Sequence, residues 1–395
     1  MPLGRIELPH LVPKTSVLSV ELQRLKELIS GKIIPSMTDF TQTIEEIEKE
    51  IRETPYHKGT EHHIGKLRAR LARIKDKEYE YEIKRSGGGG GGGYAVKKHG
   101  DATVVLIGAP SVGKSTLINQ ITNAESKVAA YAFTTVSVIP GMLKYKGAYI
   151  QIFDLPGIIT GASLGKGRGK EVLSVARVSD LLVIMTDVER IGLLEKIVSE
   201  LETAGIRINK EKPQVKIEKK VDGGIIIHSN IKQGITNETI KEIASEFGLK
   251  NAEIAIKEKL SLDSLIDAFS TSRVYLPAIF VVNKADKLNP KDKKEKDVLY
   301  LSAEKGLGIE EFKEALWETL DLTKVYLVRE DEKPNFDDPI IVKKDYTLEN
   351  VAERISADFA EKKKLAKIWG PGALFPGQEV SLTAQVKEGM QIKFL

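Results

Sequence analysis

The sequence predicts an α/β fold built on a mainly parallel sheet, and its strand pattern is the main reason. Short apolar segments, among them ATVVLIG, AYIQIFD, LLVIMTD and AIFVVNK, alternate with stretches of helical periodicity from Asp101 onward. Such alternation is typical of parallel strands with helices on both faces of the sheet. A glycine-rich turn follows the first segment, and Asp or Asn-Lys ends the others. We therefore expect the functional residues at the strand ends.

Length and composition limit the classes of protein to consider. A chain of 395 residues exceeds one ordinary core, so we expect about two to four domains. The absence of cysteine excludes a disulfide scaffold, a cysteine zinc site and thiol catalysis. Lys and Arg outnumber Asp and Glu by only 60 to 56, so contact with nucleic acid requires local basic patches. No apolar run approaches the ~20 residues of a membrane span, and we expect a cytoplasmic protein without membrane contact.

The first hundred residues divide into three segments. Residues 1–36 are a weakly patterned extension of uncertain status, and a natural start at Met37 is an equal alternative. Residues 37–86 predict a helical hairpin with a basic face over GKLRARLARIKDK. A solvated surface is the simpler interpretation of that face, and an RNA-facing surface is the alternative. Seven consecutive glycines then indicate a flexible linker over 87–100, because glycine has no side chain to bury.

Two further units follow from the pattern after the linker. Residues 101–323 carry the sheet described above, interrupted by 190–275. This interruption contains GGIIIHSN, ETIKEIASEFG and LSLDSLIDAF, enough for a small α/β insert with its own core. Residues 324–395 predict strands over VYLV, PIIVKK and QIKFL and a helix over TLENVAERIS, an order that a small β-grasp fold explains.

A phosphate-binding loop is the clearest motif. GAPSVGKST fits G-x-x-x-x-G-K-[ST] and lies between the strand TVVLI and the helical run LINQI, as the motif requires. Its glycines let backbone N–H groups approach phosphate. Lys114 is placed for the β- and γ-phosphates and Ser115 for Mg²⁺. The predicted contacts to the nucleotide are Gly108, Ala109, Pro110, Ser111, Val112, Gly113, Lys114, Ser115 and Thr116.

A second motif ends the strand AYIQIFD. Asp154, Leu155, Pro156 and Gly157 form D-x-x-G, which places a carboxylate beside Mg²⁺ and a glycine N–H at the γ-phosphate. Alone, DLPG is also compatible with a simple turn, but a phosphate loop precedes it by one helix and one strand. The intervening AYAFTTVSVIPG supplies Phe133, Thr134 and Thr135 to the same predicted nucleotide site.

The third and fourth motifs select the base. NKAD places Asp286 to accept hydrogen bonds from guanine N1–H and its amine, which adenine does not offer. We interpret Asp286 as a buried acceptor, Asn283 as holding the loop, and Lys284 as lying along the base. YLSAEKG ends another strand, with the backbone N–H groups there available to the guanine O6 through Ser302, Ala303 and Glu304. The ordered set predicts a P-loop GTPase that binds GTP and GDP with Mg²⁺.

One residue predicts slow turnover. Ile158 stands where many signalling GTPases have a glutamine that orients the attacking water. A small-molecule kinase and a non-hydrolysing binding module are the competing functions. NKAD with SAEKG favours the GTPase over the kinase, and a hydrolysis assay separates it from the binding module.

These motifs resemble a known family. GAPSVGKSTLINQIT, AAYAFTTVSVIPG, FDLPGIITGASLGKGRGKEVLSVAR and NKAD are similar to the developmentally regulated GTP-binding proteins, within the Obg-like translation-associated GTPases. The resemblance extends from about Met37 to Leu395. It implies a helix-turn-helix element in the hairpin, a ribosomal-protein-like insert, and a C-terminal TGS domain over 324–395.

The resemblance also implies roles and partners. Thr135 joins Ser115 as a Mg²⁺ ligand, and the catalytic residues are Lys114, Thr135, Asp154 and Gly157. A place near ribosomes or RNA is implied, with a protein regulator on the TGS domain or the hairpin. Some relatives use a P-loop asparagine to recruit K⁺, but Ser111 occupies that place here, which speaks against K⁺ as a second cofactor.

Overall fold

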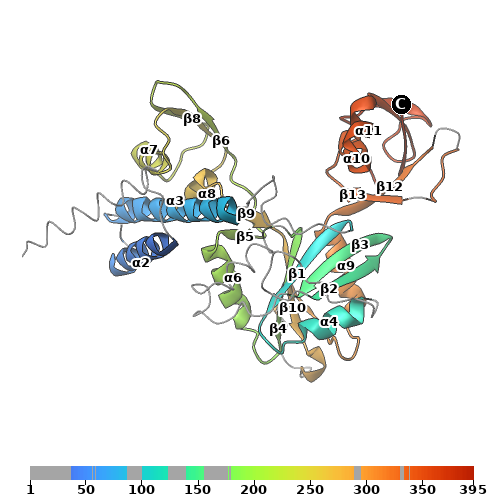
Figure 1. The fold of residues 1–395 in the computed structure, drawn as a ribbon, viewed down its shortest axis with the longest axis horizontal. Helices are drawn as coiled ribbons and strands as arrows, with labels where there is room; N and C mark the ends of the chain where they lie inside the picture. The colour runs from blue at the N-terminus through green and yellow to red at the C-terminus, as the bar shows by residue number, and fades with distance from the viewer. Residues whose placement is uncertain are drawn as a thin grey trace, which may run out of the picture. The chain divides into compact units, whose positions relative to one another are not determined.

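A computed structural model gives the fold of the chain (Figure 1). It describes residues 37–55, 57, 59–86, 100–122, 139–154, 177, 179–288, 295–329, 333–337 and 339–395. Two compact units share these residues, Met1–Gly93 with Lys212–Arg273, and Tyr94–Glu211 with Val274–Leu395. Within the described ranges, none of the helices has the length and apolar character of a membrane span.

A six-stranded sheet is the framework of the second unit, in the order β11-β10-β4-β1-β3-β2. Its strands pair in parallel, except β2, which runs antiparallel to β3. The strands are β1 (Ala102–Gly108), β2 (Ile139–Tyr145), β3 (Ala148–Asp154), β4 (Leu181–Asp187), β10 (Ala278–Asn283) and β11 (Val298–Tyr300). The parallel strands therefore present their carboxyl ends at one edge, where ligands bind in such sheets.

Helices cover both faces of this sheet, as the continuous apolar strands predict. Every residue of β1 is buried. Its alternate residues Val104 and Leu106 pack with α4 (Lys114–Ile121) and α9 (Ile309–Thr319). Val105 and Ile107 point to the opposite face, where α6 (Leu193–Thr203) packs. A separate pair of short parallel strands, β5 (Ile206–Ile208) and β9 (Val274–Leu276), extends the second face.

The C-terminal part of this unit has its own sheet and core. The five strands lie in the order β13-β12-β16-β14-β15, with the first and last strands of the segment, β12 and β16, paired in parallel. Helix α10 (Leu348–Ile355) begins at a capping box formed by Thr347 and Asn350 and is followed by α11 (Ala357–Lys362). The apolar side of α10 packs on the sheet. The strands are β12 (Leu322–Leu327), β13 (Pro339–Lys343), β14 (Leu365–Trp369), β15 (Gln378–Ser381) and β16 (Met390–Phe394).

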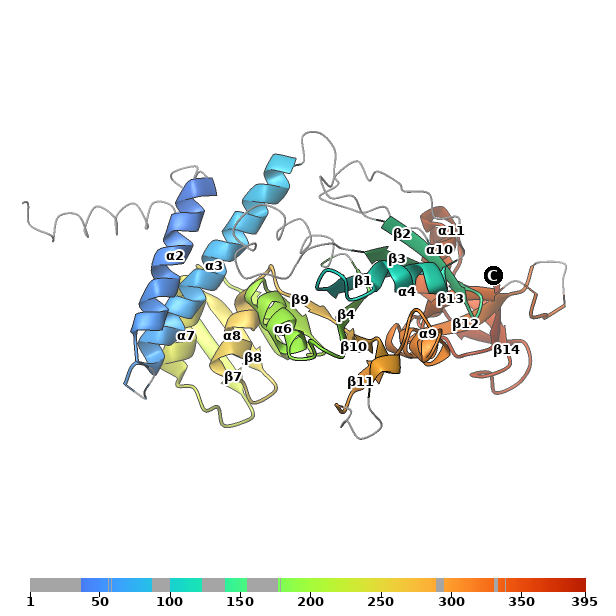
Figure 2. The ribbon, with the colours of Figure 1, turned by 90° about the horizontal axis from the view of Figure 1, so that it is seen from below.

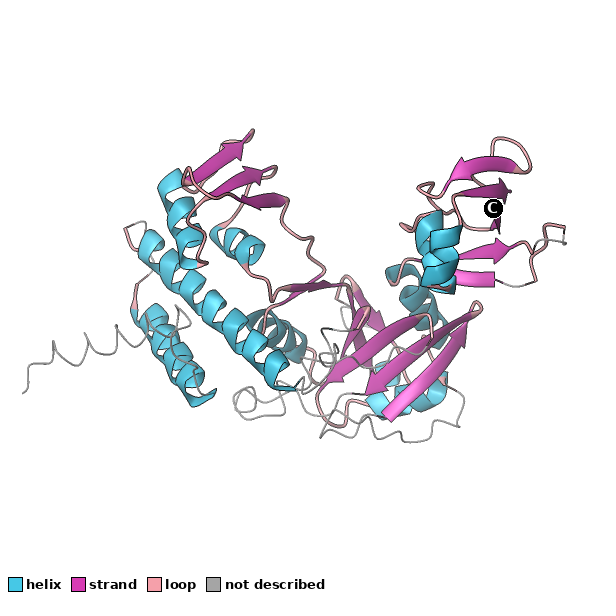
Figure 3. Ribbon diagram, turned by 45° about the horizontal axis from the view of Figure 1, so that its top comes forward, coloured by secondary structure: helices cyan, strands magenta, loops and turns pink. Residues whose placement is uncertain are grey.

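The first unit joins two long helices to the insert. Helices α2 (Met37–Glu53) and α3 (Glu61–Ser86) lie side by side in Figure 2 and bury Phe40 and Ile47 against Leu67 and Ile74. The insert has a three-stranded sheet in the order β6-β8-β7 with two helices (Figure 3). Its elements are β6 (Val215–Lys219), β7 (Ile225–Ser229), α7 (Asn237–Glu246), β8 (Ala252–Ile256) and α8 (Leu262–Phe269).

Helix α3 packs directly on the insert, which the sequence did not indicate. Its small residues Ala69 and Ala72 are buried in the insert core. On the predicted basic face, Arg68 Nη1 lies 3.0 Å from the carboxylate of Asp263, and Arg73 donates to the carbonyl oxygen of Glu246. Part of the basic face therefore contacts the insert, which neither of the two interpretations of this face included.

The boundaries of the insert also differ from the prediction. We expected it over 190–275, but the compact unit that contains it takes only Lys212–Arg273. Helix α6 and strands β5 and β9 belong to the unit of the large sheet. The reason is that Leu194, Ile197 and Leu201 of α6 cover one face of that sheet. An amphipathic helix has the same periodicity whichever core it covers.

Candidate nucleotide-binding site

Two glycines of the loop after β1 lie too close to neighbouring residues for a side chain to fit. A Cβ at Gly108 would lie 2.2 Å from the carbonyl oxygen of Met185. At Gly113 the φ angle is +93°, and a Cβ would lie 2.3 Å from Nδ2 of Asn283. Any side chain at either position would collide with a neighbouring strand end, so glycine is required at both.

Lys114 is held inside this loop. It is 7% exposed, and its Nζ donates to the carbonyl oxygens of Gly108 and Ala109, each at 3.1 Å. Burial lowers the pKa of Lys114, while Asp154, whose Oδ1 lies 3.9 Å from Nζ, acts in the opposite direction. The loop thus positions a cation at the N-terminus of α4, where the backbone N–H groups also attract an anion.

Asp154 and Ser115 meet beside the lysine. The parallel pairing of β1 with β3 sets Asp154 opposite Leu106, close to the start of the phosphate loop. Ser115 Oγ donates to Asp154 Oδ2 at 2.7 Å. The other carboxylate oxygen, Oδ1, is buried and has no hydrogen-bond partner among the described residues. A buried carboxylate oxygen without a donor needs a cation or water to stabilise its charge.

Asn283 joins the phosphate end of the site to the base end. It is 4% exposed at the end of β10, and its Nδ2 donates to the carbonyl oxygen of Val112 at 2.8 Å. Its Oδ1 accepts from the backbone N–H of Ala303 at 2.9 Å. One amide side chain therefore fixes the distance between the P-loop and the SAEKG loop.

Asp286 lies on the short 3-10 turn η1 (Ala285–Lys287) that follows β10. We expected a buried acceptor, but the structure shows this carboxylate exposed on the wall of the pocket. Burial would come from the base that it contacts. A hydrogen bond from the Ser302 side chain lowers the pKa of Asp286, so the carboxylate is ionised at neutral pH and ready to accept two donors.

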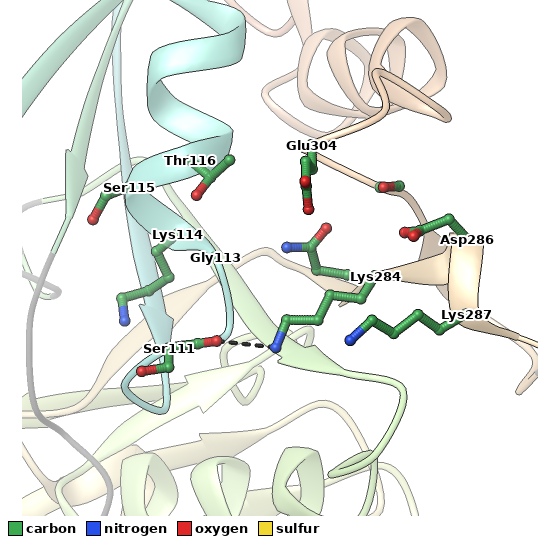
Figure 4. A pocket seen from close by; sticks show the side chains of 11 residues that line it. Ser111, Gly113, Lys114, Ser115, Thr116, Lys284, Asp286, Lys287 and Glu304 are labelled. Atoms are coloured by element: carbon green, nitrogen blue, oxygen red, sulfur yellow. Dashed lines mark hydrogen bonds between the residues drawn. The ribbon is translucent and has the colours of Figure 1, made fainter.

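A cavity of about 360 Å³ connects these groups (Figure 4). In Figure 4 the P-loop side chains lie on one side and those of η1 and the SAEKG loop on the other. This volume suits a nucleotide-sized ligand. Its lining residues are Ser111, Gly113, Lys114, Ser115, Thr116, Asn283, Lys284, Asp286, Lys287, Ser302 and Glu304.

Comparison with known proteins decides the family. The family model described as "50S ribosome-binding GTPase" matches residues 103–220, and the model of the C-terminal region of that domain matches 222–322. Human developmentally-regulated GTP-binding protein 2 is 40% identical over 352 residues, which cover 87% of this chain and 95% of the human protein. This chain belongs to the developmentally regulated GTP-binding proteins. It is therefore a GTPase that binds GTP and GDP.

Two other relatives extend across much of the chain in the same way. A GTP-binding protein of Methanocaldococcus jannaschii is 42% identical over 367 residues, covering 90% of this chain and 93% of that protein. Developmentally-regulated G-protein 3 of Arabidopsis thaliana is 39% identical over 361 residues, covering 89% of this chain and 97% of its own length. The similarity to this family thus includes both the GTPase sheet and most of the flanking segments.

Several predicted site residues of this developmentally regulated GTP-binding protein lie outside the described residues. They are Phe133, Thr134, Thr135, Leu155, Pro156 and Gly157, together with Ile158. Of the remaining predicted residues, Ala109 and Val112 are buried in the loop interior and Ala303 beneath the base end, whereas Pro110 is exposed.

Two residues of this GTPase-family site were missed by the sequence analysis. Asp187 ends β4, is fully buried, and contacts Lys284 of NKAD. Arg190 follows three residues later and reaches both Asp187 and the P-loop. An aspartate at the end of the buried run LLVIMTD was the available signal, because parallel strands bring their carboxyl ends together.

Proposed function

We propose that this GTPase is a switch that acts on ribosomes or RNA in translation. It binds Mg²⁺·GTP, hydrolyses it slowly by itself, and changes its affinity for its partner with the nucleotide state. The carrying observation is the pocket that Lys114 and Ser115 line at the phosphate end and Asp286 at the base end, with Asp154 accepting a hydrogen bond from Ser115. The description of the matching family model as a 50S ribosome-binding GTPase supports the ribosomal partner.

Mg²⁺ fits the phosphate end of this pocket. Ser115 Oγ and Asp154 offer hard oxygen atoms. Oδ1 of Asp154 accepts no hydrogen bond from the described residues and lies 3.9 Å from the Lys114 ammonium, and a bound cation and its water shell would stabilise it further. Ser115 and, by the family resemblance, Thr135 would be its ligands. The ion would neutralise charge on the β- and γ-phosphates. Ser111 at the position of the potassium-recruiting asparagine argues against K⁺.

Slow intrinsic turnover follows from the sequence of the D-x-x-G segment. Ile158 has no group to orient water, so the hydrolytic water would be positioned only after a partner brings or orders another polar group. Catalytic roles for Thr135 and Gly157 are part of this proposal. The pattern of slow turnover and external stimulation is characteristic of switches.

The flanking segments are the surfaces we propose for partners. We interpret 324–395 as a TGS domain and 37–86 as a helix-turn-helix element, with one of them binding a protein regulator. Arg68 and Arg73 of α3 contact the insert, so the two arginines also serve to hold this unit together. A ribosomal partner places the protein in the cytoplasm.

Co-sedimentation of the full chain with ribosomes tests the partner. We expect more protein in the ribosomal pellet with a non-hydrolysable GTP analogue than with GDP. Contacts with RNA phosphates release counterions, so the bound fraction should fall steeply as salt rises. Equal and negligible pelleting with both nucleotides at low salt would contradict a ribosomal role while leaving the GTPase assignment intact.

A further inference from the structure

The tip of the P-loop is held by two cations, Lys284 on the wall of the nucleotide pocket and Arg190 outside its lining, that share one buried carboxylate. Asp187, at the end of β4, is 0% exposed. Its Oδ2 accepts from Arg190 Nη2 at 2.6 Å and from Lys284 Nζ at 2.9 Å, and its Oδ1 accepts from Arg190 Nε at 3.2 Å. The two-point contact of a guanidinium with a carboxylate fixes the plane of the arginine.

Both cations continue to the P-loop backbone. Lys284 Nζ also donates to the carbonyl oxygen of Ser111 at 3.1 Å, the bond drawn in Figure 4. Arg190 Nη1 donates to the preceding carbonyl oxygen, that of Pro110, at 3.3 Å. Asp187 therefore supports two consecutive peptide groups at the loop tip through two different side chains.

Arg190 is itself held in place by the turn that follows β4. Its backbone N–H donates to the carbonyl oxygen of Asp187 at 3.0 Å. Its own carbonyl oxygen accepts from Thr186 Oγ1 at 2.9 Å. The backbone of Arg190 is therefore held by the turn, and its guanidinium by the buried carboxylate. Little side-chain freedom remains to be lost when the guanidinium binds the loop.

The geometry of the peptide unit gives these contacts a consequence for the ligand. In a trans peptide the carbonyl oxygen and the following N–H point in opposite directions. Holding the oxygens of Pro110 and Ser111 outward turns the N–H groups of Ser111 and Val112 to the other side of the loop. Ser111 has a φ of +61°, and a left-handed residue in such a run lets successive N–H groups converge on an anion.

We propose that Arg190 is a positioning residue for the diphosphate of the bound nucleotide. It acts through the Pro110–Ser111 peptide, and Lys284 acts in parallel through the next one. Arg190 should therefore affect the binding of nucleotides that carry a β-phosphate, because the loop tip would surround that phosphate and not the base.

The test compares nucleotides that differ in the β-phosphate. Arg190→Gln should weaken GDP binding by about tenfold, chiefly through faster GDP dissociation, because one charge-assisted bond at the loop tip is lost. GMP, which lacks the β-phosphate, should bind as to the wild type, as measured by competition against a fluorescent GDP analogue. Arg190→Lys keeps the ion pair but not the fork, and should recover only part of the loss.

Arg207→Gln is the matched control, because Arg207 Nη1 also donates to a backbone carbonyl, that of Glu202 at 2.7 Å, away from the pocket. It should leave GDP dissociation unchanged. The proposal is overturned if Arg190→Gln binds GDP as the wild type does, or if GDP and GMP weaken equally. If Arg190→Gln does not fold, Arg190→Lys decides, and wild-type GDP dissociation in that variant overturns the proposal.

Discussion

At the scale of single residues, we expect Asp286 to decide which base this GTPase accepts. Asp286→Asn replaces an ionised acceptor by a group that both donates and accepts. We expect GTP affinity to fall more than about tenfold, because the guanine N1–H and amine lose their shared acceptor. Xanthosine triphosphate should gain affinity, since its O2 accepts from the new amide. Competition against a fluorescent GDP analogue measures both changes, and equal affinity of the wild type for ATP and GTP would refute the role of Asp286.

Lys114 and Ser115 should be required for the ligand and not for the fold. The described contacts of the Lys114 side chain are to loop carbonyls and Asp154, and Ser115 is exposed. Lys114→Ala and Ser115→Ala should therefore abolish Mg²⁺·GTP binding with unchanged circular dichroism. Asn119→Ala, at an exposed position of the same helix, is the control and should bind Mg²⁺·GTP as the wild type does. Hydrolysis at the wild-type rate in either site variant would contradict their roles.

Asp187 should make the free energy of unfolding depend on pH in the acidic range. Hydrogen bonds from Arg190 and Lys284 lower its pKa from 3.8 to about 2. A folded-state pKa below the unfolded value adds stability above about pH 4, which is lost as the pH falls toward about 2, and the shift corresponds to roughly 2 kcal/mol. The difference in unfolding free energy between wild type and Asp187→Asn should therefore shrink by about 1.5 kcal/mol between about pH 6 and about pH 2.5, since the lower pH is still above the folded-state pKa. A pH-independent difference would show that Asp187 is not held as described.

At the scale of elements, α3 is fastened to the insert by a buried carboxylate. Asp76 is 6% exposed and accepts from Ser270 Oγ at 2.7 Å, from the Thr271 N–H at 3.1 Å and from the Ser272 hydroxyl. Asp76→Ala leaves buried donors without an acceptor and should destabilise this unit by about 2 to 4 kcal/mol.

The control at the same interface is an exposed pair. Asp263 contacts Arg68 from α8, but its side chain is 68% exposed. Asp263→Ala should cost below about 1 kcal/mol, because solvent screens such pairs. Urea unfolding of the full chain measures both variants. Equal losses would mean that burial of Asp76 does not determine the strength of the contact.

The sequence predicted where strands and helices form better than it predicted which core each of them packs against. The strands ATVVLIG, AYIQIFD, LLVIMTD and AIFVVNK all appear, and helices α4 and α6 follow the first and the third of them. Helix α6 was assigned to the insert, and the arginines of α3 were assigned to solvent or RNA. Both errors concern what packs on an amphipathic face, which periodicity does not specify.

The same limit applies to the site. The residues predicted for the nucleotide site belong to motifs with fixed spacing, so Lys114, Asp154, Asn283 and Asp286 were named from the sequence alone. Asp187 and Arg190 act through the backbone of the P-loop, and their contacts depend on how separate strand ends meet. The strand-end position of Asp187 was the available signal, but no motif spacing marks Arg190.

At the scale of the whole molecule, we expect the GTPase unit to depend on an outside partner for rapid hydrolysis of GTP. The D-x-x-G segment carries Ile158, and the flanking units are not required to form the nucleotide pocket, whose lining comes entirely from the unit of the large sheet. Association with ribosomes should accordingly weaken with salt, while GTP affinity, set by enclosed contacts, should change far less.

Single-turnover hydrolysis of GTP by the full chain, with and without ribosomes from the same organism, tests the central claim most directly. We expect slow hydrolysis by the protein alone and an increase of at least about tenfold with ribosomes at low salt, because the partner would supply the missing orientation of water. Asp286→Asn, which binds GTP poorly, should show no increase. A turnover rate that ribosomes leave unchanged would contradict the account.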